Sequence, residues 1–89
     1  MKDLELKDKR LLYAVLRENK NQITKWGVQD YEPATWLMFA TEELGELAKA
    51  ISDWGFREGS NLSVANEAIQ TATLALKIAE MFLNLESSI

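Results

Sequence analysis

Apolar residues recur every three or four positions along three stretches of the chain, which is the spacing of amphipathic helices. The first stretch predicts a helix from about Asp3 to Lys25, with an apolar face of Leu4, Leu11, Leu12, Val15, Leu16 and Ile23. The second predicts a helix from about Pro33 to Trp54, with a stripe of Leu37, Ala40, Leu44, Leu47, Ala48 and Ile51. The third predicts a helix from about Ser63 to Leu85, whose apolar side is mostly small: Ala65, Ala68, Ala72, Ala75 and Ala79, mixed with Ile69, Leu76, Ile78 and Phe82.

The residues that break helices fall between these stretches. Pro33 suits a first helical position, because its missing N–H would be unpaired there. Gly55 and the polar residues 57–61 end the second helix, and Ser63 is a plausible N-cap for the third. The predicted fold class is all-α, with three helices in a single domain spanning residues 1–89.

Composition narrows the chemistry. The chain has no cysteine and no histidine, which excludes disulfides, thiol nucleophiles, imidazole bases and the usual zinc ligands. A net charge of −4 argues against a nucleic-acid polymer as partner. The longest apolar run, Trp36 to Ala40, is too short to span a membrane, and the first ten residues lack the apolar core of a signal peptide, so we expect a cytoplasmic protein.

Acidic residues gather on the second and third helices. Glu42, Glu43 and Glu46 fall on one face of the second helix, and Asp53 returns to that side two turns later. If these helices form an antiparallel hairpin, Glu67 reaches the same height, and Glu43, Glu46 and Glu67 can converge on a site that suits Mg²⁺. Gln70 follows Glu67, and Lys77 lies on nearly the same face as Gln70, where it could meet a phosphate. An E-x-x-E pattern alone is also common on solvated helices.

The segment from Trp26 to Phe82 resembles the MazG-like all-α nucleoside triphosphate pyrophosphohydrolase family. The first motif of that family, E-E-x-x-E, is matched by Glu42-Glu43-Leu44-Gly45-Glu46, and the segment before it by Trp26-Gly27-Val28-Gln29, Pro33 and Trp36-Leu37. The second motif, E-x-x-D, is matched by Glu67-Ala68-Ile69-Gln70, where an amide replaces the last acid. The segment 67–78 is similar to a branch of the family that has glutamine there.

The resemblance implies hydrolysis of a nucleoside triphosphate between its α and β phosphates, with Mg²⁺, or Mn²⁺, as the cofactor. The metal would be held by Glu43, Glu46 and Glu67, and Glu42 would orient the attacking water. Gln70 contributes one neutral oxygen and no charge, which weakens attraction for the cation.

Base recognition falls to the connector between the first two helices. Trp26 or Trp36 can stack on a base, and Gln29 can hydrogen-bond to its edge. Large aromatic residues at helical spacing are more often core residues, and Trp36 and Phe39 fit that interpretation better than Trp26 does. Trp54 is expected either to close the hairpin or to pack across a subunit boundary, and Asp53 is a possible extra ligand.

Three striped helices cannot close a full core, and the family resemblance implies a homodimer or homotetramer with a four-helix-bundle core. The alanine-rich face of the third helix and the leucine face of the first are the expected contact surfaces, and Arg10 or Arg17 of a neighbouring chain could complete the phosphate pocket. Two other functions stay open: a nucleotide-binding relative with little or no turnover, and a structural helical oligomerisation module.

Overall fold

The computed structural model describes residues 5–87, with side chains described for residues 5–85. Three helices follow one another, α1 (Arg10–Trp26), α2 (Pro33–Gly55) and α3 (Asn61–Ser87), and the described residues contain no strand. The all-α prediction is therefore confirmed. The described residues contain no helix with the length and apolar character that a membrane crossing requires.

The boundaries of α2 match the prediction, whereas those of α1 and α3 differ. Helix α1 begins at Arg10 because Asp8 accepts hydrogen bonds from the Arg10 and Leu11 backbone N–H groups, at 2.9 and 3.1 Å. Residues 5–9 are not helical, and the predicted helical residues Asp3 and Leu4 lie outside the described part. Helix α3 begins before Ser63, because the Ser60 hydroxyl accepts the Ser63 N–H at 3.0 Å. The prediction that Ser63 is the N-cap of this helix was therefore wrong.

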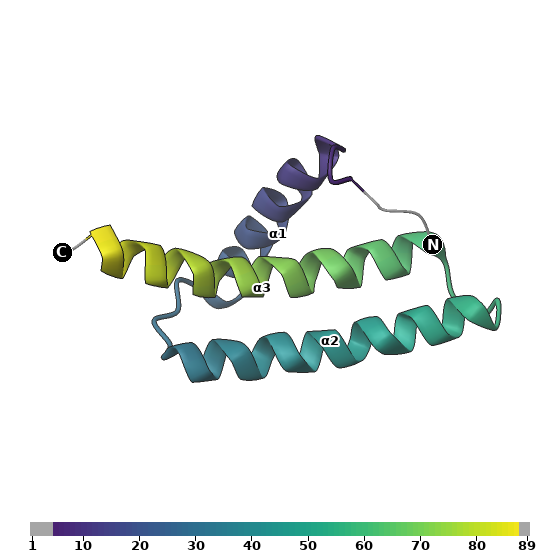
Figure 1. The fold of residues 1–89 in the computed structure, drawn as a ribbon. Helices are drawn as coiled ribbons and strands as arrows, with labels where there is room; N and C mark the ends of the chain where they lie inside the picture. Colours follow the sequence, from purple (N-terminus) through teal and green to yellow (C-terminus); the bar gives the residue numbers. More distant parts are fainter. Residues whose placement is uncertain (1–4, 88–89) are drawn as a thin grey trace.

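Helices α2 and α3 lie side by side and antiparallel, and α1 crosses α3 without packing against α2 (Figure 1). The predicted hairpin is confirmed. The side chain of Trp54 bridges the turn between α2 and α3, because its indole N–H donates a hydrogen bond to Asn61 Oδ1 at 2.6 Å. This contact matches the hairpin-closing role, one of the two predicted for Trp54.

The inward face of α2 coincides with the predicted apolar stripe only in part. Trp36 and Ala50 are buried, and Ala40, Glu43 and Leu47 are half-buried between them, whereas Leu37, Leu44 and Ile51 keep about half or more of their surface exposed. On α3 the buried residues are Thr73 and Leu74, and most of the alanine face is exposed. The stripe prediction was right for Ala40 and Leu47 and wrong for its other members, because α3 packs against the adjacent row of α2, which carries Trp36, Glu43 and Ala50.

Candidate functional site

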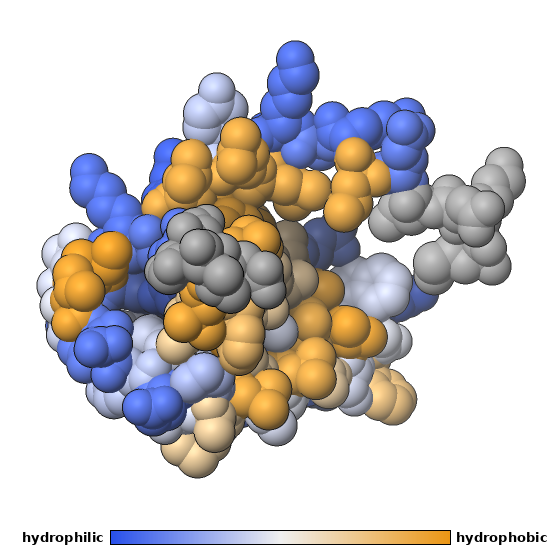
Figure 2. All heavy atoms as spheres, turned by 60° about the vertical axis from the view of Figure 1, so that its left-hand side comes forward, coloured by the Kyte–Doolittle hydropathy of each residue, from blue (hydrophilic) through white to orange (hydrophobic). Residues whose placement is uncertain are grey.

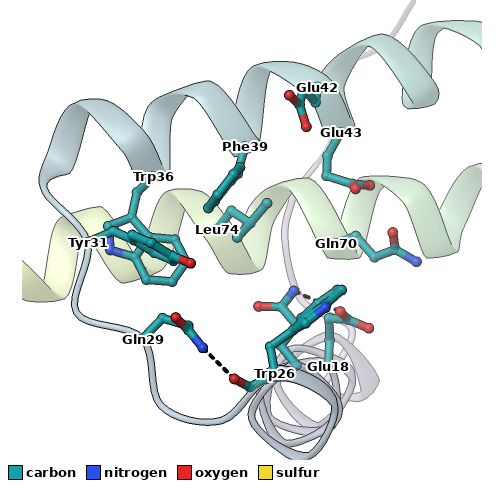
Figure 3. A pocket seen from close by; sticks show the side chains of 11 residues that line it. Glu18, Trp26, Gln29, Tyr31, Trp36, Phe39, Glu42, Glu43, Gln70 and Leu74 are labelled. Carbon is teal, nitrogen blue, oxygen red and sulfur yellow. Dashed lines mark hydrogen bonds between the residues drawn. The ribbon is translucent and has the colours of Figure 1, made fainter.

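All three helices and the first connector surround one cavity of about 400 Å³. Its walls are formed by Glu18, Gln22, Trp26, Gln29, Tyr31, Trp36, Phe39, Glu42, Glu43, Gln70 and Leu74 (Figure 3). The volume falls within the range of small-molecule sites in proteins. Residues from both matched motifs and from the connector therefore line the same space.

One end of the cavity is aromatic. Tyr31, Trp36 and Phe39 pack edge to face, with ring centroids 5.3 to 6.0 Å apart. Trp36 is buried, as predicted for a core residue, while Trp26 is exposed and lies across the cavity on α1. Gln29 donates from its amide nitrogen to the Trp26 carbonyl oxygen, which turns its own oxygen toward the aromatic group. This end can hold a flat ring and one hydrogen-bonding edge.

The connector takes this path because Gly27 ends α1. The Gly27 N–H donates to the Ile23 carbonyl at 2.7 Å, and the residue has φ 76° and ψ 178°. Side-chain-bearing residues almost never adopt that conformation. The chain then turns back to Pro33, which brings Tyr31 against Trp36 near the start of α2 and leaves Gln29 between Tyr31 and Trp26.

The other end of the cavity is acidic. Glu43 points from α2 toward α3, and its carboxyl lies within hydrogen-bonding reach of Glu67. Burial raises the pKa of Glu43, and the nearby carboxyls of Glu67, Glu46 and Glu18 raise it further. Glu67 Oε2 is buried without a hydrogen-bond partner among the described residues. A shared proton or a cation would satisfy both groups.

The predicted acidic residues are only partly brought together. Glu43 and Glu67 meet, Glu42 lines the cavity from an exposed position, and Glu46 is exposed but close enough to influence Glu43. Within the described residues, no three carboxylates are arranged so as to hold a metal ion. A cation would therefore have Glu43 and Glu67 as its nearest ligands, with the remaining positions filled by water or phosphate, as Mg²⁺ often accepts. Asp53 lies half-buried at the hairpin turn and does not line the cavity.

Lys77 lies beside the cavity rather than in its wall. Its ammonium group donates to Gln22 Oε1 at 2.6 Å and lies 5.0 Å from the centre of the Trp36 ring. Partial burial lowers the pKa of Lys77, and the charge of Glu18 opposes that shift. Lys77 and Trp36 also line a second, more open hollow of about 190 Å³.

Two cavity residues on α1 were missed from the sequence. Glu18, Gln22 and Trp26 follow at four-residue spacing, so they share one face of the helix. The spacing is visible in the sequence, but these residues lie outside the apolar face of the helix, and a polar row of this kind is usually solvated. Only the crossing of α1 over α3 turns these residues toward the cavity.

Comparisons of the chain with protein-family models, with curated proteins and with solved structures found no match. The MazG-like resemblance therefore depends on the motif residues of this chain alone.

Proposed function

We propose that this protein is a Mg²⁺-dependent nucleoside triphosphate pyrophosphohydrolase of the MazG-like kind, which removes unwanted nucleotides. The observation that carries the proposal is the cavity itself, in which an aromatic and amide end faces the half-buried carboxyl of Glu43, with Glu67 of the next helix beside it. A nucleotide has matching ends, a flat base and a metal-bound phosphate chain.

The aromatic end would bind the base. Trp26 is exposed enough to stack on a base, and the Tyr31–Trp36 pair forms the wall opposite. Gln29 offers its carbonyl oxygen toward the base edge because its amide nitrogen is bound to the Trp26 carbonyl. Lys77 is bound to Gln22, so a direct phosphate contact would require that hydrogen bond to break.

The acidic end would hold the metal and the phosphates. Glu43 and Glu67 would supply the first ligands, Glu46 a further charge, and Gln70 a neutral oxygen. Bound Mg²⁺ would screen the phosphate charge and make a water more acidic. Glu42, at the exposed side of the cavity, would accept a proton from the water that adds to the α phosphorus. The bond between the α phosphorus and the oxygen that bridges it to the β phosphate would then break, and the products would be the nucleoside monophosphate and pyrophosphate.

A nucleotide-binding protein with little turnover is the second candidate. It is favoured by Gln70, which stands where the resembled motif has an acid, and by a carboxyl pair where the prediction had three converging acids. Both functions use the same cavity, so they are separated by turnover and not by binding.

We also propose that the chain self-associates as a homodimer or homotetramer with a four-helix-bundle core. Leu12, Leu16, Leu37, Leu44 and Leu76 each keep more than half of their surface exposed. Figure 2 shows apolar side chains over much of one face of the molecule. A second copy of the chain would cover these exposed apolar side chains.

The direct test is pyrophosphate release from a panel of ribo- and deoxyribonucleoside triphosphates with Mg²⁺ or Mn²⁺. We expect turnover with at least one triphosphate and its loss in Glu67→Gln, because the carboxylate, one oxygen of which is buried, is replaced by a neutral group of nearly the same shape. Glu58→Gln, on the exposed hairpin turn, is the matched control. Metal-dependent stabilisation by a triphosphate without turnover would favour the second candidate. If the protein shows neither turnover nor stabilisation by a triphosphate, the structural oligomerisation module would be the function that remains.

A further inference from the structure

A chain of hydrogen bonds runs along the α1 wall of the cavity. Lys77 Nζ donates to Gln22 Oε1 at 2.6 Å, and Gln22 Nε2 donates to Glu18 Oε2 at 2.8 Å. An ammonium group only donates and a carboxylate only accepts, so the two ends fix which way the Gln22 amide is turned. Glu18 is thereby held with one oxygen bound, and among the described residues its other oxygen makes no hydrogen bond.

The position of Glu18 along the cavity follows from its neighbours. Its charge acts on Lys77, which lies over Trp36 at the aromatic end, and on Glu43 at the acidic end. Figure 3 shows Glu18 on α1, opposite Glu43 and Gln70 and beside the Trp26 ring. Glu18 therefore lies between the two ends of the cavity, on the wall that faces the α2–α3 hairpin.

A nucleotide that spans the cavity places its sugar between the base and the phosphates. The polar groups of the sugar are hydroxyls, which donate hydrogen bonds, and a carboxylate is a strong acceptor for them. A carboxylate likewise binds ribose hydroxyls in other nucleotide-binding folds. The second oxygen of Glu18 is an acceptor on the α1 wall, at the point in the cavity where the sugar would lie.

We propose that Glu18 binds the sugar hydroxyls of the nucleotide and that Gln22 and Lys77 are positioning residues for it. The inference builds on the proposed function and adds that the substrate is selected by its sugar. A nucleotide without sugar hydroxyls would leave the second oxygen of the Glu18 carboxylate desolvated and without a hydrogen bond, which is more costly than the loss of a surface hydrogen bond.

The experiment compares ribo-, 2′-deoxy- and 2′,3′-dideoxynucleoside triphosphates that carry the same base. In the wild-type protein we expect kcat/KM to fall by about tenfold or more from the best of these sugars to the dideoxy form. In Glu18→Gln that difference should shrink to within about twofold, through a higher KM for the hydroxyl-bearing substrates with kcat little changed. Glu58→Gln should keep the wild-type sugar preference.

Lys77→Met tests the positioning role. It keeps much of the apolar stem but removes the donor that holds Gln22, so we expect a partial loss of sugar preference, again in KM. Lys77→Arg, which retains a donor, should restore part of it. An unchanged sugar preference in Lys77→Met would overturn the positioning role, and circular dichroism identifies any variant that has lost its helices.

The result that would overturn the role of Glu18 is an equal loss of kcat/KM for all three sugars in Glu18→Gln, which would instead assign it to the metal or to the fold. A wild-type protein indifferent to the three sugars would overturn it as well. If no triphosphate is hydrolysed, tryptophan fluorescence is titrated with the corresponding monophosphates. A sugar preference in Kd that Glu18→Gln abolishes would then support Glu18 although the hydrolase proposal had failed.

Discussion

At the scale of single residues, the carboxyl of Glu43 belongs to the proposed site but lowers the stability of the fold when it is ionised. Burial and neighbouring carboxyls raise the pKa of Glu43. A carboxyl with a higher pKa in the folded chain binds more protons there than in the unfolded chain. Its stabilising contribution is therefore complete below the unfolded pKa and declines as the pH rises through the folded pKa.

We expect Glu43→Gln to raise the urea midpoint of unfolding at pH 8 and to have little effect at about pH 4. The reason is that the amide removes a charge that the folded state disfavours only when it is ionised. Added Mg²⁺ should stabilise the wild-type protein more than the variant, because a cation compensates the same charge. A lower midpoint for Glu43→Gln at pH 8 without metal would contradict this account.

At the scale of elements, the end of α1 decides where the connector goes. Gly27 has φ 76° and ψ 178°, a combination open almost only to glycine. Gly45 lies inside α2, and a Cβ added there would meet nothing within 4 Å. The two glycines therefore offer a matched pair of substitutions with opposite expected signs.

We expect Gly27→Ala to lower the free energy of unfolding by about 1 to 3 kcal/mol, since the alanine must adopt a strained backbone. The same change should weaken nucleotide binding, because Trp26 and Gln29 flank the turn. Urea denaturation and fluorescence titration measure the two effects.

Gly45→Ala is the control and should raise stability by about 0.5 to 1 kcal/mol, because alanine favours a helix interior over glycine. A destabilised Gly45→Ala would mean that another surface packs closely on this part of α2. A neutral Gly27→Ala would mean that the connector can take another path.

At the scale of the whole molecule, the chain is more open than a compact monomer of the same mass. It exposes 7683 Å², whereas a compact monomer of this mass is expected to expose about 5,300 Å². Its radius of gyration is 14.7 Å, compared with about 12 Å for a compact domain of this length. The excess surface is larger than the roughly 800 Å² that each partner buries in an interface of standard size.

We expect sedimentation equilibrium to give a mass of two or four chains. Leu12→Lys on α1 and Ala72→Glu on α3 place charges on the two exposed apolar faces, and at least one of them should shift the equilibrium toward single chains. Lys20→Glu, on the polar side of α1, is the control. A wild-type protein that sediments as one folded chain would exclude the self-association proposal.

The sequence by itself determined the helices and the hairpin. Apolar periodicity sets where a helix can bury a face, and Pro33, Gly27 and Gly55 mark where the chain must turn, so the main elements follow from local information. The starts of α1 and α3 were the exceptions, because the side chains of Asp8 and Ser60 accept hydrogen bonds from the backbone there. The facing of Glu43 and Glu67 was also predictable, since the hairpin length places them at one height.

Only the tertiary structure decided which row of α2 faces inward and what completes the cavity. Helix α2 carries two adjacent rows that can be buried, and the packing of α3 selected the row of Trp36, Glu43 and Ala50. The crossing of α1 over α3 then brought Glu18 and Gln22 to the cavity, far in sequence from Lys77. Such contacts depend on the angle and depth at which helices pack, and the spacing of residues within one helix carries no information about either.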